Sequence, residues 1–277
     1  MANLQSVRQP QHHGVFYPAD PVLLNRQLDD CFNYANYDSG CSERIKAIVV
    51  PHAGFDYSAH VAAQAYASLR QQDWIQRVVI LAPNHQTSVT GGLVSSHKNW
   101  VTPLGEVATD QDFLDKNWSG LQHIVCDDAV HQAEYSIEVQ LPFLQRILPG
   151  IPIVPLLLGD CTPEQIDEIL RPAWESADTL IIISSDLYHY LPRESALPTG
   201  MAIAQAIENN EVTSITPQTA CGYTALRGLM QFAARSQHYW RTLAVQHSGQ
   251  DNRFAAAGLV GYGAFLLIEP SACRVSG

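Results

Sequence analysis

Four apolar runs alternate with helix-like segments, and this alternation constrains the fold more than any other feature of the chain. The runs lie at 44–50, 77–83, 152–159 and 179–185 and read RIKAIVV, RVVILAP, PIVPLLLG and TLIIISS. Such continuous apolar character is typical of strands that are buried on both faces of a parallel sheet. Their alternation with helices predicts an α/β fold with a mixed, largely parallel central sheet flanked by helices.

Amphipathic segments separate and follow these runs. Thr162 followed by Pro163 is a helix start signal, with threonine as the N-cap and proline in the first turn. We predict helices over 21–35, 58–72, 110–118, 136–148, 162–177, 199–210 and 222–236. An edge strand is expected over 91–96, and two closing strands that pair antiparallel over 240–248 and 258–269. Glycines in the last strand suggest a close approach of the backbone to a neighbour. We predict one domain, residues 1–277.

Composition argues against several classes of protein. Of the 277 residues, 46% are hydrophobic and 16% are charged, which favours a sizeable core over disorder. The net charge is −11, from 16 Lys and Arg against 27 Asp and Glu. A nucleic-acid binder normally presents a basic face, so we expect no nucleic-acid partner. The acidic balance instead suits a soluble protein that acts on small molecules or on basic or neutral partners.

The chain shows neither a membrane span nor a signal peptide. Its longest apolar runs, such as IPIVPLLLG, are far shorter than the roughly 18 residues that a span requires. The first residues, MANLQSVRQPQHHG, lack an apolar core. We therefore expect a cytoplasmic location and no membrane partner. Six cysteines without a CxxC pair are expected to be free thiols in a reducing cytosol: Cys31, Cys41, Cys126, Cys161, Cys221 and Cys273.

Reactive side chains follow three of the four apolar runs. His52 follows the first run, His85 the second, and Asp186 with His189 the last. In α/β sheets, ligands bind beyond the carboxyl ends of the parallel strands. Neighbouring strands are about 4.8 Å apart, so histidines that end two neighbouring strands are placed to share a metal ion. A single histidine at a strand end is usually an ordinary hydrogen-bonded group, but the repetition favours a site.

Two further groups are weaker candidates. Glu134 and Glu138 are four residues apart, so they share a helix face if the helix begins early enough. Alternatively, Glu134 is a capping carboxylate and Glu138 a solvated helix residue, and only Glu134 is assigned a site role. Cys221 stands near a predicted helix start, where the helix dipole lowers a thiol pKa. By pattern alone, Cys221 is more typical of a small buried hydrophobe.

Six motifs in order resemble the Memo family (mediator of ErbB2-driven cell motility): HHGVFYPAD, VVPHAGFDYSAHVAAQAY, ILAPNH, EYSIEVQLPFL, ISSDLYHY and TACGYTAL. The resemblance runs from about residue 7 to 267. That family is similar in fold to the class III extradiol dioxygenases. The resemblance implies a metal site made by His52, His85 and Cys221. It also implies that Asp186 and His189 lie in the same pocket.

The chain departs from these patterns in two places. Many relatives read EHSIE where this chain has Tyr135 in place of the histidine. The extradiol enzymes hold Fe(II) with two histidines and a carboxylate, whereas a cysteine softens the site toward Cu or Zn. The resemblance thus implies a metal-dependent dioxygenase or other oxidoreductase that holds Fe(II) or Cu, with Zn as a third candidate. We expect its substrate to be an unidentified small molecule and its catalytic residues to be His189 and Asp186, with Glu134 added from the helix pattern.

Two other functions compete with this one. The animal family member is described as a phosphotyrosine-peptide binder, so the alternative is a non-catalytic (phospho)peptide-binding module using the same pocket. Phosphate recognition favours clustered arginine, which the motifs lack. A zinc hydrolase that uses a metal-bound water is a weaker third option. Bacterial relatives are grouped with radical-SAM and AMMECR1-like proteins, which implies an association with such partners.

Overall fold

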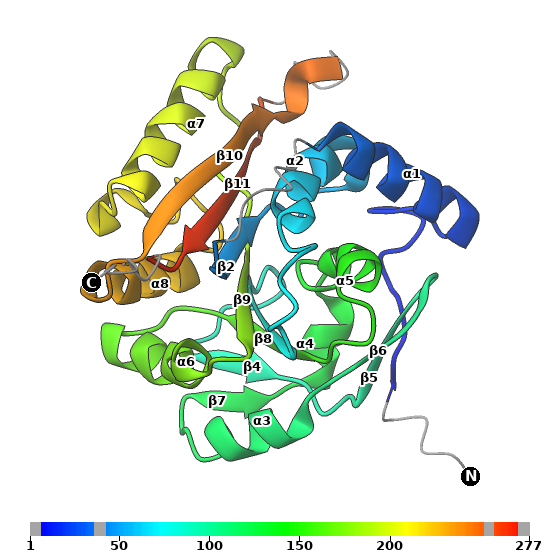
Figure 1. Ribbon diagram of the computed structural model, residues 1–277, viewed down its shortest axis with the longest axis vertical. Coiled ribbons are helices and arrows are strands. Elements are labelled where there is room, and N and C mark those ends of the chain that lie inside the picture. The colour runs from blue at the N-terminus through cyan, green and yellow to red at the C-terminus, as the bar shows by residue number, and fades with distance from the viewer. Residues whose placement is uncertain (1–6, 36–42, 252–257, 271–277) are drawn as a thin grey trace, which may run out of the picture.

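An eight-stranded sheet forms the centre of the molecule (Figure 1). The structure, a computed structural model, describes residues 7–35, 43–251 and 258–270. The strand order is β10-β11-β2-β9-β3-β8-β4-β7. In that order the strands are Tyr239–His247, Gly261–Ile268, Ile45–Val50, Thr179–Ser184, Arg77–Pro83, Ile153–Leu158, Gly92–Val94 and Ile124–Cys126.

Strand directions confirm the predicted fold class. The four central strands β2, β9, β3 and β8 are mutually parallel and correspond to the four apolar runs. β11 joins β2 antiparallel, β10 joins β11 antiparallel as predicted, and β4 joins β8 antiparallel. The sheet is therefore mixed, with a parallel centre.

The prediction fails for the short strands. β4 is second from the end of the sheet, because β7 pairs with its outer side, so the predicted edge position of β4 is wrong. β1, β5 and β6 form a separate three-stranded sheet that was not predicted, and they span Val7–Arg8, Asn99–Thr102 and Gly105–Ala108. Strands this short carry too few apolar residues to show a period.

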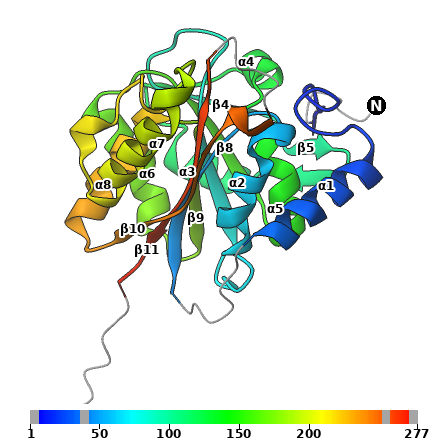
Figure 2. The same ribbon diagram turned by 90° about the horizontal axis from the view of Figure 1, so that it is seen from above.

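Helices cover both faces of the sheet (Figure 2). One core layer includes α1 (Pro21–Tyr34), α2 (Phe55–Ala67), α4 (Asp128–Ala133) and α5 (Leu141–Ile147). The other includes α3 (Gln111–Asn117), α6 (Pro163–Glu175), α7 (Arg193–Glu208) and α8 (Tyr223–Arg235). Successive residues of a strand point to opposite faces, so Ile48 packs in the first layer and Val49 in the second. Both α2 and α7 begin earlier than predicted.

The predicted helix 136–148 is interrupted at its start. α4 ends before Glu134, a 3-10 turn spans Glu138–Gln140, and α5 follows. The carboxylate of Glu134 accepts hydrogen bonds from the backbone N–H groups of Tyr135 and Ser136, both at 3.0 Å, which stabilises this break. Glu134 and Glu138 therefore do not share the face of one continuous helix.

Glu138 is buried, so its interpretation as a solvated helix residue is wrong. Its carboxylate forms an ion pair with Arg8 at 2.6 Å, and both side chains are 0% exposed. Tyr17 donates its hydroxyl to the same carboxylate at 2.6 Å. The N–H of His12 adds a bond of 2.9 Å. This network fixes the N-terminal segment against the turn that carries Glu134.

Glycine in β11 allows the segment after β9 to lie close to the sheet. A Cβ added to Gly261 would lie 2.4 Å from a ring carbon of Tyr188, so any larger residue would force the ring or the strand to move. The backbones of Leu187 and Gly261 are hydrogen-bonded at 2.8 Å. The expected close approach is confirmed, and it holds the segment that carries Asp186.

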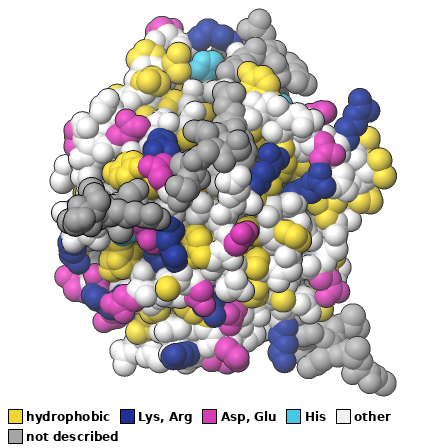
Figure 3. Space-filling view, in the orientation of Figure 1, with side chains coloured by type: hydrophobic (Ala, Val, Ile, Leu, Met, Phe, Trp, Pro, Cys, Tyr) yellow, Lys and Arg dark blue, Asp and Glu magenta, His cyan; other side chains and the backbone are white. Residues whose placement is uncertain are grey.

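Surface charges are intermixed on the face shown in Figure 3, with acidic and basic side chains interspersed. Among the described residues, no helix has the length and apolar character needed to cross a membrane.

Candidate metal centre

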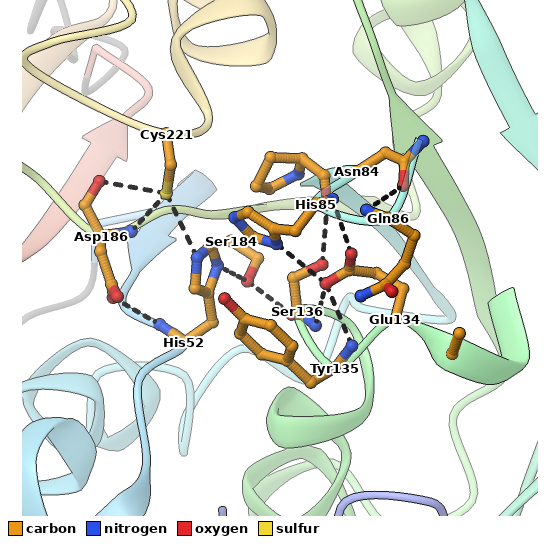
Figure 4. Close-up of polar contacts among 12 residues, drawn as sticks. His52, Asn84, His85, Gln86, Glu134, Tyr135, Ser136, Ser184, Asp186 and Cys221 are labelled. Atoms are coloured by element: carbon orange, nitrogen blue, oxygen red, sulfur yellow. Dashed lines mark hydrogen bonds and ion pairs between the residues drawn. The ribbon is translucent and has the colours of Figure 1, made fainter. Parts of the chain in front are cut away.

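His52, His85 and Cys221 converge beyond the carboxyl ends of the central strands (Figure 4). One ligand atom from each residue lies within 4.8 Å of the other two. The Sγ of Cys221 is 3.2 Å from Nε2 of His52. Two ligands of one tetrahedral ion, bonded at about 2.3 and 2.0 Å, are about 3.5 Å apart. The donor set therefore fits a metal ion, and the predicted convergence of these residues is confirmed.

The two histidines do not end neighbouring strands, so this part of the sequence prediction is wrong. β9 lies between β2 and β3, which places the two strand ends roughly 10 Å apart. The imidazoles close the gap by reaching over the end of β9, and their ring centroids are 5.3 Å apart. Ser184, the last residue of β9, supports one of these rings.

Ser184 fixes the tautomer of His52. Its hydroxyl donates to the carbonyl of Ser136 at 2.6 Å and accepts from the amide of Gln140 at 2.8 Å. The third contact, 2.9 Å to Nδ1 of His52, is therefore donated by the imidazole. Nδ1 carries the proton and leaves Nε2 free to bind a cation. Burial lowers the pKa of His52 to about 3, which keeps the ring in its neutral, ligating form.

Glu134 fixes the tautomer of His85. Nδ1 of His85 is 3.0 Å from one carboxylate oxygen, and the backbone N–H of His85 donates to the other at 2.7 Å. Burial alone would raise the pKa of Glu134, but the hydrogen bonds from His85 and Ser136 hold it at about 2. A carboxylate behind a ligating histidine orients the ring and raises its basicity. These contacts orient the ring of His85. A catalytic role for Glu134 stays a prediction.

Replacing Glu134 with glutamine is expected to lower metal affinity about 10- to 100-fold, because His85 loses its carboxylate partner. Competition with a chelator measures this change. Glu164→Gln on the exposed start of α6 is the control and should leave the affinity unchanged. Equal affinities for the two variants would contradict an orienting role for Glu134.

Cys221 precedes the first residue of α8 by two positions. The N–H of Asp186 donates to its sulfur at 3.1 Å. Burial nevertheless raises the pKa of the thiol, the direction opposite to the lowering expected from the helix dipole. A bound cation would supply the positive charge that favours the thiolate.

Asp186 lies inside the site, whereas His189 is exposed. The Asp186 carboxylate accepts from the backbone N–H groups of His52 at 2.8 Å and Ala53 at 3.3 Å, so it holds the turn after β2. Burial raises the pKa of Asp186 to about 6. His189 forms no hydrogen bond with the three ligands, but its charge influences the pKa of Asp186. Catalytic roles for both residues stay predictions.

Sequence reasoning missed three supporting residues: Ser184, Gln140 and Arg8. Ser184 belongs to the SSD stretch that ends the last apolar run, so its position was a usable signal. Arg8 donates to the carbonyl of Glu134 at 3.0 Å and pairs with Glu138. Nothing in the local pattern of a short N-terminal segment indicates that an arginine is buried.

A cavity of about 210 Å³ adjoins the centre on the Cys221 side. It lies between the segment that leads into His85, including Asn84, and the start of α8. Asp160 is its only charged lining residue, and it accepts a hydrogen bond of 2.6 Å from Tyr223. The cavity thus offers a small, polar, anionic space next to the ligands.

The family model and the curated relatives that match this protein cover most of the chain. The family model described as Memo-like protein matches residues 8–265. A MEMO1 family protein of Methanococcoides burtonii is 33% identical over 273 residues, 94% of this chain and 100% of the relative. A second, from Methanobrevibacter smithii, is 32% identical over 237 residues, 78% of this chain and 84% of the relative. A solved structure of an uncharacterized Escherichia coli K12 protein covers 80% of this chain and 99% of its own. Its TM-score of 0.45 and 11% identity are too low to bear on fold or function.

Proposed function

This chain belongs to the Memo-like protein family, and we propose that it is a metal-dependent redox enzyme acting on a small molecule. His52, His85 and Cys221 would hold Fe(II) or Cu, with Zn as the third candidate. The observation that supports this most is the convergence of the three ligand atoms within 4.8 Å. When bound, iron or copper would supply redox chemistry, of the kind that the extradiol dioxygenases use, whereas Zn would supply only Lewis-acid chemistry.

The protein's own groups would prepare this site. Ser184 and Glu134 hold the two imidazoles in the tautomer that leaves Nε2 free. Asp186 fixes the turn that carries His52, and we assign His189 the transfer of protons to and from substrate, because histidine is suited to proton transfer near neutral pH. His189 is exposed, which suits exchange of protons with solvent.

The cavity next to Cys221 lacks the basic groups that would attract a phosphate. Its lining contains Asp160 and no lysine or arginine. A phosphopeptide-binding module would need a cationic pocket, normally with arginine. The peptide-binding alternative therefore has less support than an enzyme. A cytoplasmic location and an association with radical-SAM and AMMECR1-like proteins belong to the same proposal and come from the family resemblance.

Oxygen uptake after anaerobic reconstitution tests the proposal. The protein is loaded with Fe(II), Cu(I) or Zn(II) and exposed to oxygen with a panel of catechols and other small reductants. We expect substrate-dependent oxygen uptake with iron or copper only, and its loss in His52→Ala. The control is His60→Ala, an exposed histidine of α2. Tight binding of a phosphotyrosine peptide without any oxygen uptake would favour the binding module instead.

A further inference from the structure

The ring of Tyr135 is held between two other rings beside the metal centre. It stacks on His85 with centroids 5.0 Å apart and an interplanar angle of 4°. It also stacks on Phe16, with centroids 4.3 Å apart and an angle of 24°. The edge of His52 meets it at 5.7 Å and 83°. With His12 at 5.8 Å, four ring neighbours restrict the plane of this phenol, and two of them are the histidine ligands.

The hydroxyl of Tyr135 has no hydrogen-bond partner within the described part of the chain. Figure 4 shows this hydroxyl at the end of the ring nearest His52, on the side of the three ligands. Two buried tyrosines use their hydroxyls inside the protein: Tyr17 donates to Glu138 at 2.6 Å and Tyr66 to Gln140 at 2.9 Å. Tyr135 is only partly buried, and its hydroxyl is reached by solvent. A fixed donor that is open on the side of an ion-binding set is placed to meet a ligand.

We propose that Tyr135 donates a hydrogen bond to a negatively charged ligand atom bound at the ion, and so favours anionic ligands or substrates that reach the metal through such an atom. The inference rests on the proposed metal centre. A donor held in place before the ligand arrives loses little conformational freedom on binding. A phenol supplies this donor and stays neutral, whereas a protonated histidine at the same position would add a positive charge.

Azide binding to the Co(II)-loaded protein tests the inference without measuring turnover. Azide is a small anion, and Co(II) reports its ligands by visible absorption. Tyr135→Phe keeps the ring and removes only the hydroxyl. We expect this variant to bind Co(II) with unchanged stoichiometry and to bind azide roughly 10-fold more weakly, the effect of losing one hydrogen bond to a charged group. Tyr34→Phe, at an exposed position of α1, is the control and should match the native protein.

The remaining outcomes distinguish a failure of the Tyr135 inference from a failure of the proposed metal centre. Unchanged azide affinity in Tyr135→Phe overturns the inference and leaves the metal centre intact, because the hydroxyl is then only solvated. Loss of Co(II) from Tyr135→Phe also overturns it, since the hydroxyl would then support the site itself. Failure of the native protein to bind Co(II) overturns the metal centre and the inference together.

Discussion

Cys221→Ala is expected to lower the affinity of the protein for Zn(II) or Co(II) by about 100-fold or more, because it removes one of three protein ligands. Loss of an outer partner of a ligand already costs about 10- to 100-fold, and a ligand contributes more. The thiolate is also the only ligand of the three that brings a negative charge to the ion. Chelator competition measures the affinity, and the sulfur-to-metal absorption band of the Co(II) protein should disappear.

Cys161→Ala is the matched control for this experiment. Cys161 is a free, partly exposed thiol and does not belong to the converging set. It should keep both the affinity and the absorption band. If Cys221→Ala bound metal as tightly as Cys161→Ala, the assignment of Cys221 as a ligand would be wrong.

Arg8→Met is expected to destabilise the protein by about 3–5 kcal/mol, the usual cost of leaving one member of a buried ion pair unpaired. Arg8 and Glu138 are both fully buried. The arginine also donates to the carbonyl of His131 at 2.8 Å and lies over the ring of Trp100 at 4.4 Å. Urea unfolding followed by circular dichroism measures the loss.

Two further variants test whether the unpaired buried charge causes the loss of stability. Adding Glu138→Leu to Arg8→Met should restore part of the loss, because neither charge then remains buried and unpaired. Arg171→Met removes an exposed pair with Asp167 on α6 and should cost less than about 1 kcal/mol. A loss no larger for Arg8→Met than for Arg171→Met would contradict the importance of the buried pair.

The centre of the fold could be predicted because its strands are long and apolar. β2, β3, β8 and β9 all follow from their runs, and so does the position of His52 and His85 beyond strand ends. The insertion of β9 between β2 and β3 could not be predicted, because strands that are neighbours in the sheet need not be consecutive along the chain. The distance that the two imidazoles must span was therefore underestimated.

Contacts between residues far apart in the sequence also could not be predicted. Cys221 reaches the site from a segment 169 residues beyond His52, and only the family resemblance pointed to it. The burial of Glu138 depends on Arg8, which is 130 residues away. The four-residue spacing of Glu134 and Glu138 is typical of two carboxylates on one exposed helix face. Only the ion pair of Glu138 with Arg8 shows that Glu138 is buried. The stacking of Tyr135 on His85 and Phe16 likewise joins three separate segments.

Anomalous diffraction from anaerobically prepared crystals, collected at the iron, copper and zinc edges, tests the central claim most directly. We predict one anomalous peak within bonding distance of Nε2 of His52, Nε2 of His85 and Sγ of Cys221, and the edge at which it appears will identify the metal. A metal bound elsewhere, or these three side chains turned apart with no peak between them after metal loading, would contradict the claim.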